Sequence, residues 1–237
     1  MTLRRSGVQS VVLENQYLAD PVENGKISTN TATSGAQTGS ILAWAEGYTG
    51  AGTRIAVIDT GSDTDHQSLD AAAFEYALAE IAAEKGMSKE AYIESLLDAE
   101  EIAAVAGDLN VTIDPETAYL STKLPFAYNY KDTDYDVTHD NDEEGEHGSH
   151  VAGIATANTY IPSGSGFVKA LETVYVQGVA PEAQLLTLKV FGKGGSPYDS
   201  DYFAAIEDAI VLGADVVNLS LGSVAPGRGT HDNAAFE

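Results

Sequence analysis

Two histidines, His147 and His150, lie close together in the stretch GEHGSHVAG, among glycines and small apolar residues. Such a pair favours either a metal site or a catalytic base beside a histidine with a structural role. The metal interpretation lacks an obvious third ligand, although many acidic residues precede the pair. We expect His147 to accept a proton from a nucleophile while a carboxylate holds its other ring nitrogen. A solvated loop histidine is the alternative for His147, and a helix residue with local hydrogen bonds is the expectation for His150.

A carboxylate for this role follows the apolar run of TRIAVIDTG. The run Ile55–Ile58 predicts a buried parallel strand, and Asp59 stands at its carboxyl end. Functional groups gather at the carboxyl ends of strands in open parallel sheets. Asp59 is therefore a candidate site residue, with a helix cap or a turn as the alternative.

Several other segments must position these residues. Further core strands are predicted by FAYNY (126–130), AQLLTLKVFG (183–192) and DVVNLSLG (215–222). Helices are predicted over 39–46, within 71–105, over 150–157 after Gly148 and Ser149, and over 200–214 with Ser200 as its cap. Strands that alternate with helices predict an α/β fold with a parallel sheet. Residues 1–38 are weakly patterned, and we expect an extended arm there.

The composition excludes several function classes. The chain has 237 residues, of which 43% are hydrophobic, so it can bury a sizeable core. Its formal charge of −24 disfavours nucleic acid and anionic membrane surfaces as partners. There are no cysteines, which excludes disulfides, thiolate metal sites and a cysteine nucleophile. We find no apolar run of membrane-spanning length, and the first residues lack the apolar stretch expected of a signal peptide.

Four motifs carry a resemblance when they are read together. IAVIDTG, HGSHVAG, GVAPEAQLLTLKVFG and VVNLSLG occur in this order. Over about residues 39–222 the chain resembles the subtilisin-like (subtilase) serine peptidases. The four motifs are most similar to those of the cell-envelope branch, which includes lactocepin-type and complement-cleaving streptococcal peptidases. The resemblance implies a three-layer fold on a parallel sheet, secretion or attachment to the cell envelope, autoprocessing and a polypeptide substrate.

The resemblance also implies residue roles. Asp59 matches the aspartate of a Ser-His-Asp triad, and His147 matches its histidine, while His150 matches a non-catalytic histidine. Ser149 replaces the commoner threonine and keeps the hydroxyl. The strand that pairs with the substrate backbone is matched by Leu219, Ser220, Leu221 and Gly222.

The nucleophile of the family is missing from the chain. No serine stands in a G-T-S-M-A motif, and the family's oxyanion asparagine is absent. We therefore expect residues 39–237 to be the N-terminal part of a subtilase catalytic domain, inactive alone, with residues 1–38 an arm or a pro-segment remnant. A truncated chain and a nicked light chain are both open. A companion chain that bears the serine is the expected partner; a pseudo-enzyme or a non-catalytic binding module is the alternative.

An acidic stretch precedes His147. Counted from its first residue, acids occupy positions one, three, five, nine and twelve, namely Asp132, Asp134, Asp136, Asp140 and Glu143. An EF-hand requires glycine at position six, where this chain has Val137. A looser structural calcium site and a solvated acidic loop remain open, and we expect no required cofactor. The segment 71–124 is expected to be a helical surface insertion.

Overall fold

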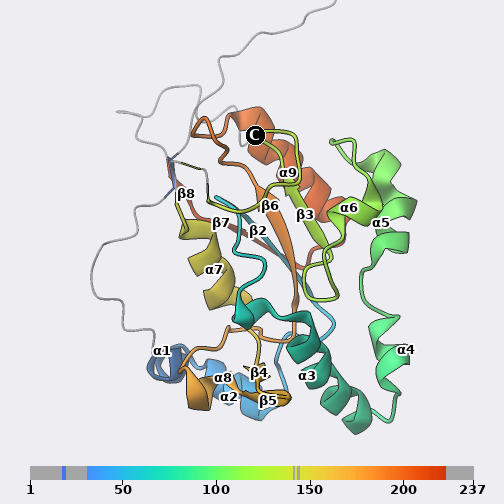
Figure 1. Cartoon of the computed structure of the whole chain (residues 1–237), viewed down its shortest axis with the longest axis vertical. Coiled ribbons are helices and arrows are strands. Elements are labelled where there is room, and N and C mark those ends of the chain that lie inside the picture. Colours follow the sequence, from blue (N-terminus) through green and yellow to red (C-terminus); the bar gives the residue numbers. More distant parts are fainter. Residues whose placement is uncertain (1–17, 20–30, 141, 143–144, 223–237) are drawn as a thin grey trace, which may run out of the picture.

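Four parallel strands form the central sheet of the protein (Figure 1). Their order across the sheet is β3 (Phe126–Asn129), β6 (Gln184–Lys189), β2 (Arg54–Asp59) and β7 (Val216–Leu219). The computed structural model describes residues 18–19, 31–140, 142 and 145–222. It confirms the predicted α/β fold with a parallel sheet, and all four predicted core runs form strands at or near the expected positions.

The alternation of side chains along β2 and β6 divides the core into two faces. Ala56 and Ile58 point to one face and join Leu186 and Leu188 in the largest cluster of buried residues. Val57 points to the other face and joins Leu185. Since successive strand residues face opposite sides of a sheet, both faces of these central strands must be covered.

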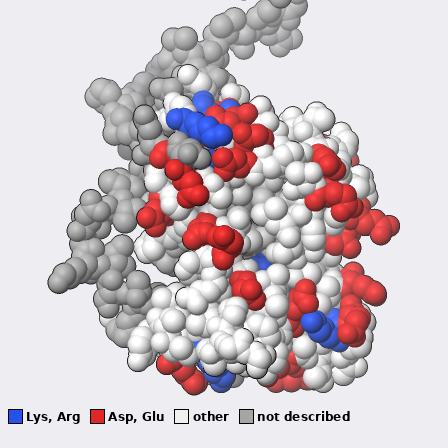
Figure 2. All heavy atoms as spheres, viewed as in Figure 1, with Lys and Arg blue, Asp and Glu red and all other residues white. Residues whose placement is uncertain are grey.

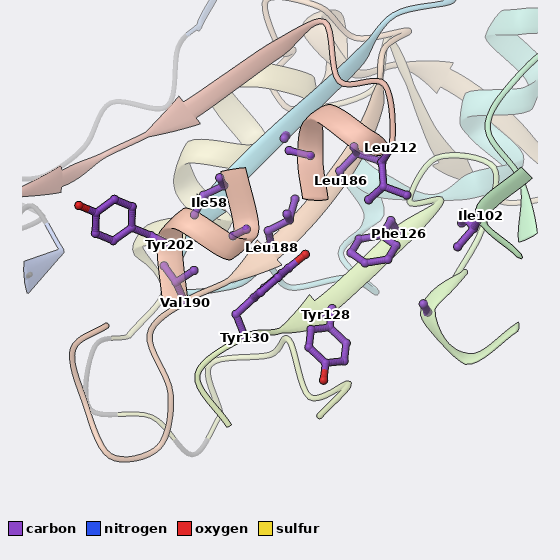
Figure 3. Packing of buried hydrophobic residues seen from close by; sticks show 14 of the residues in the cluster. Ile58, Ile102, Phe126, Tyr128, Tyr130, Leu186, Leu188, Val190, Tyr202 and Leu212 are labelled. Carbon is purple, nitrogen blue, oxygen red and sulfur yellow. The ribbon is translucent and has the colours of Figure 1, made fainter. Parts of the chain in front are cut away.

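Helix α9 (Asp199–Val211) covers the first face (Figure 3). Its buried residues Tyr202, Ala205 and Ala209 pack on the strands, together with Phe126 of β3. The helix begins one residue before the predicted start, and its cap is Tyr198, so the prediction that Ser200 caps it is wrong.

Helix α7 (His147–Thr156) covers the second face and packs against β2 through the buried Ala152. The prediction that this helix begins at His150 is wrong by one turn, because His147, Gly148 and Ser149 already have helical backbone. His147 therefore stands at the first position of the helix, which fixes its place relative to the sheet.

The segment between Asp59 and β3 is helical for most of its length. It contains η1 (Gln67–Leu69), α3 (Ala71–Glu84), α4 (Lys89–Ile93), α5 (Ala99–Val105), η2 (Ala106–Asp108) and α6 (Pro115–Ala118). The helical pattern predicted within 71–105 is divided into α3, α4 and α5. Ser88 caps α4 by accepting a hydrogen bond from the Ala91 N–H.

Smaller elements surround the sheet near its amino ends. They are α1 (Thr31–Thr38), α2 (Ser40–Ala45), the hairpin of β4 (Tyr160–Ser163) and β5 (Gly166–Lys169), and α8 (Ala170–Thr173). The prediction of an extended arm over residues 1–38 is wrong for Thr31–Thr38, which are helical. Residues 1–17 and 20–30 lie outside the described residues.

Strand β7 is one of the two edge strands of the four-stranded sheet among the described residues, and it differs from the core strand that its sequence predicts. Val216 and Leu219 are 55% and 41% exposed. After Ser220, β8 (Leu221–Gly222) pairs with a different segment, β1 (Leu18–Ala19), in an antiparallel two-stranded sheet.

The surface agrees with the acidic composition. Figure 2 shows Asp and Glu side chains spread widely over one face, with few Lys and Arg side chains between them. Within the part of the chain that the structure describes, no helix is long and apolar enough to cross a bilayer.

Candidate active site

Asp59 is the last residue of β2 and is almost completely buried, with 1% of its surface exposed. Its Oδ1 accepts hydrogen bonds from the Thr60 N–H at 2.7 Å and from the His147 ring at Nδ1, also at 2.7 Å. The structure thus brings together the two residues that the sequence predicts as members of a triad. They are 88 positions apart in the chain.

The hydrogen bond to Asp59 determines which ring nitrogen of His147 is free to react. A carboxylate only accepts, so Nδ1 carries a proton and Nε2 of the neutral ring holds the lone pair. The His147 side chain is 11% exposed, so solvent or a reactant can reach part of it. The lone pair of Nε2 therefore points away from Asp59, on the side of the ring opposite the hydrogen bond.

Burial dominates the electrostatics of Asp59. Removal of the carboxylate from water raises its pKa, and the hydrogen bonds from His147 and from the Thr60 N–H oppose that rise. Its second oxygen, Oδ2, is buried and has no hydrogen-bond partner among the described residues. The fold therefore holds a carboxylate in an environment that costs stability.

The turn after Asp59 packs directly on the first turn of α7. The Gly148 N–H donates to Thr60 Oγ1 at 2.9 Å. A Cβ atom on Gly148 would lie 2.1 Å from the Gly61 carbonyl oxygen, so only glycine fits there. Gly61 has φ = 105°, and a Cβ on it would lie 2.1 Å from the Val137 carbonyl oxygen. These contacts fix the distance between the strand that carries Asp59 and the helix that carries His147.

Ser149 ties the same helix to the loop beyond the turn. Its Oγ accepts a hydrogen bond from the Asp63 N–H at 2.8 Å, so this hydroxyl is used in a structural contact. His150 is exposed, and its backbone N–H donates to the Glu146 carbonyl oxygen at 3.1 Å. No group of three or more His, Asp and Glu side chains within the described ranges could hold a metal ion around the two histidines.

The acidic stretch before His147 forms a loop held by its own side chains. Asp132 accepts from Asn129 and from the Lys193 N–H, and Asp136 accepts from the Thr138 N–H and hydroxyl. The Lys193 ammonium lies 3.5 Å from the Asp136 carboxylate.

The five acids proposed as calcium ligands do not converge as far as the structure describes them. No three of the four described carboxylates gather to hold a cation, Asp140 is exposed, and Glu143 lies outside the described residues. The residues in view do not form the cage of oxygen ligands that calcium requires. The calcium site stays a prediction.

The residues predicted to bind the substrate backbone lie where β7 ends and β8 begins. Leu219 is the last residue of β7, and Ser220 Oγ lies 3.1 Å from Asn218 Oδ1. Leu221 and Gly222 are paired antiparallel with Ala19 and Leu18. The backbone of this segment thus accepts an extended strand beside it.

Sequence reasoning missed a second buried charge beside the site. Lys189, the last residue of β6, is 1% exposed, and its ammonium contacts the Thr60 carbonyl oxygen and the Asp142 carboxylate. The signal was present in the sequence, because a lysine within the apolar run LLTLKVF needs a buried partner. Its partner lies 47 positions away, which the local pattern does not reveal.

Comparison with known proteins identifies what this chain is similar to. Residues 50–237 match the model of the Subtilase family. The chain is 34% identical over 181 residues to the PI-type proteinase of Lactococcus lactis subsp. cremoris. It is 32% identical over 186 residues to the minor extracellular protease Vpr of Bacillus subtilis (strain 168), and 32% identical over 178 residues to a C5a peptidase of Streptococcus pyogenes serotype M3.

These matches cover most of this chain and little of the relatives. They include 74, 76 and 74% of the chain, but only 8, 15 and 12% of the respective relatives. The chain therefore corresponds to a small part of much longer proteins.

Proposed function

This chain belongs to the subtilase family, and we propose that it supplies the aspartate and histidine of a serine endopeptidase whose nucleophile stands outside its 237 residues. The observation that carries the proposal is the buried Asp59–His147 hydrogen bond of 2.7 Å, with the second ring nitrogen directed away from Asp59. No serine of the chain stands in the family's nucleophile motif. Ser149, which lies close to His147, and Ser220, which is itself a predicted substrate-binding residue, have hydroxyls engaged with Asp63 and Asn218.

The reaction is acyl transfer to a serine and then to water. His147 Nε2 removes the proton of the serine hydroxyl as its oxygen attacks the peptide carbonyl, and later returns a proton to the leaving amine. Asp59 holds the ring with Nδ1 protonated and stabilises the imidazolium while it carries both protons. Without the serine and an oxyanion donor, the chain alone has no nucleophile for this reaction and is inactive.

The substrate is a polypeptide that binds as an added strand along Leu219–Gly222. Main-chain hydrogen bonds supply affinity in this mode, and side-chain pockets supply selectivity. The antiparallel pairing of Leu221–Gly222 with Leu18–Ala19 supports this assignment, since it places an extended backbone on this segment. The net charge of −24 favours basic or neutral substrates over acidic ones through long-range steering.

The same pairing gives a role to the N-terminal region. Leu18–Ala19 occupies the strand position that a substrate would take, so this two-residue segment acts as part of a pro-segment that blocks the substrate strand. Because a two-residue ladder supplies few hydrogen bonds, a substrate or a cleavage event can displace it. One of the relatives is named an extracellular protease, and we place this protein outside the cell as well.

The serine-bearing part docks on the edge of the sheet at β7. Val216 and Leu219 on this strand are exposed, and so are Ile154 of α7 and Val179 near it, at 49% and 53%. Exposure of an edge strand and of apolar side chains to water is energetically unfavourable, so such a surface is typically covered by another segment. Further strands of the same domain would cover it, and they would bring the serine toward His147.

The proposal is tested on protein purified under native conditions with any polypeptide bound to it. The sample is treated with a fluorophosphonate serine probe, and intact masses are measured under denaturing conditions. We expect one probe on a second polypeptide or on a longer form of this chain. The His147→Gln variant should bind the same partner but react at least about a thousandfold more slowly. A single unlabelled mass equal to this chain would overturn the proposal.

A further inference from the structure

Lys189 ends β6 between two strands that carry polar residues at the same level of the sheet. The register places it beside Asp59 on β2 and beside Asn129 on β3. Its side chain is 1% exposed, and its Cδ lies 3.2 Å from the position that a Cβ of Gly61 would take. The lysine thus fills the space directly under the turn that follows Asp59.

The ammonium of Lys189 has two described partners on different parts of the chain. It donates to the Thr60 carbonyl oxygen and to the carboxylate of Asp142, whose side chain is 3% exposed. A desolvated ammonium is costly unless such partners surround it. Burial therefore favours the geometry in which the turn at Thr60 and the loop at Asp142 both contact Lys189.

Both partners lead directly to the Asp59–His147 pair. Thr60 donates its N–H to Asp59 Oδ1, and its hydroxyl accepts from the Gly148 N–H in the first turn of α7. Asp142 precedes His147 by five positions in the loop that enters α7, and its N–H donates to the His139 carbonyl oxygen. One buried cation therefore contacts both the turn that holds the carboxylate and Asp142, five positions before the imidazole.

We propose that Lys189 is a positioning residue, which holds Asp59 and His147 at hydrogen-bonding distance by clamping Thr60 to Asp142. This role rests on the proposed function, because it matters only if the pair performs acid–base chemistry. Lys189 does not touch either reacting side chain by a hydrogen bond in the described structure; it acts through Thr60 and the loop. The alternative is a lysine that supports the fold in general and has no particular effect on the pair.

The chain contains a matched control for that alternative. Lys123 is also completely buried, at 0% exposure, and its ammonium also donates to main-chain carbonyls, those of Pro181 and Ala183. It lies at the opposite end of β6, where its own carbonyl accepts from the Leu185 N–H. Replacement of either lysine by methionine removes a completely buried amino group that donates to main-chain carbonyls, but only one replacement is next to the pair.

The test observes the Nδ1 proton of His147 by NMR on the whole chain, without any need for activity. A proton held between imidazole and a buried carboxylate gives a separate far-downfield signal, and its disappearance in the His147→Gln variant assigns it. We expect exchange of this proton with water to be faster by roughly tenfold in Lys189→Met, the factor that corresponds to about 1.4 kcal/mol. Asp142→Asn, which keeps an oxygen acceptor but removes the charge, should change exchange in the same direction and by less. Lys123→Met should leave it unchanged.

The outcomes separate this proposal from the proposed function. An unchanged signal in Lys189→Met overturns the positioning role and leaves the pair intact. Equal acceleration in Lys123→Met also overturns it, since general loosening would then explain the effect. If Lys189→Met does not fold, Asp142→Asn decides, and unchanged exchange there is against the proposal. Absence of the signal in the unmodified protein would contradict the Asp59–His147 pair itself, and with it both proposals.

Discussion

Each end of the central sheet buries a lysine, and the groups that contact the ammonium differ between the two ends. At the carboxyl end, Lys189 contacts the Asp142 carboxylate. At the amino end, Lys123 donates to two carbonyl oxygens and lies 4.7 Å from the centre of the Phe74 ring. Burial lowers the pKa of Lys123 to about 7, against the opposing charge of Glu182.

The two ends of the sheet therefore differ in the charge that they hold. The amino end uses its lysine to tie the helical segment before β3 to the loop before β6, and a neutral amine could make the same two hydrogen bonds. The carboxyl end gathers ionised groups, and one oxygen of Asp59 has no partner among the described residues. Groups held at a cost to stability are typical of functional sites.

The largest expected effect concerns Asp59→Asn. In a completed domain with its serine, we expect kcat to fall by about 10⁴-fold, because the amide would favour the wrong tautomer of His147. The unfolding free energy should stay equal or rise by about 1 kcal/mol. The sign of this change in unfolding free energy follows from the raised pKa of Asp59. Because the fold disfavours the ionised carboxylate, the unfolding free energy falls as the pH rises from 3.8 through the pKa of the folded state. Kinetics and urea unfolding at pH 7 measure the two effects. A variant that loses stability and keeps its kcat would show that Asp59 supports the fold and not the reaction.

The buried lysines were not predicted, but much of the site at the carboxyl end was predictable from the sequence because it lies in local patterns. The run before Asp59 is apolar on both faces, which indicates a central parallel strand, and the structure has β2 between two neighbours. The motif around His147 indicates a base beside a carboxylate. The sequence could also indicate that glycine at position 148 permits close approach, although not to which backbone.

What could not be predicted depends on contacts between distant segments. The first turn of α7 contains glycine and serine, which have low helix propensity, so the pattern predicts a start at His150. The Thr60 and Asp63 contacts stabilise helical backbone from His147 onward. The sequence of β7 predicts a core strand because its exposed residues are apolar. Only the arrangement of the strands in space shows that β7 lies at an edge of the sheet.

The second prediction concerns the pH dependence of the amino end. The pKa of Lys123 is about 7 in the folded protein and near 10.5 in the unfolded chain, so the unfolded state binds more protons between these values. The unfolding free energy should therefore rise with pH above 7, by up to about 1.4 kcal/mol per pH unit from this group. Urea unfolding of the unmodified chain and of Lys123→Met between pH 7 and 9 measures the difference. Parallel curves for the two proteins would show that Lys123 is charged throughout this range.

The third prediction compares two glycines of α7. Gly148→Ala should lower the unfolding free energy by about 2–3 kcal/mol, because its Cβ would lie 2.1 Å from the Gly61 carbonyl oxygen and must separate the helix from the turn. Gly153→Ala on the same helix meets nothing within 4 Å and should raise stability by about 0.5–1 kcal/mol. Thermal unfolding measures both. Similar effects of the two substitutions would mean that the turn and the helix are not in the close contact described.

The smallest expected effect concerns the Ser149 hydroxyl and tests whether it helps to hold the first turn of α7 in place. Its Oγ accepts from the Asp63 N–H, and Ser149→Ala should cost about 1 kcal/mol of unfolding free energy. Ser149→Thr keeps the acceptor and should change stability by less than about 0.5 kcal/mol. Because this contact holds the first turn of α7, Ser149→Ala should also speed exchange of the His147 Nδ1 proton slightly. If the alanine and threonine variants have the same unfolding free energy, the Ser149 hydroxyl does not stabilise the site. The contacts of Lys189 with Thr60 and Asp142 would then be sufficient to hold Asp59 and His147 together.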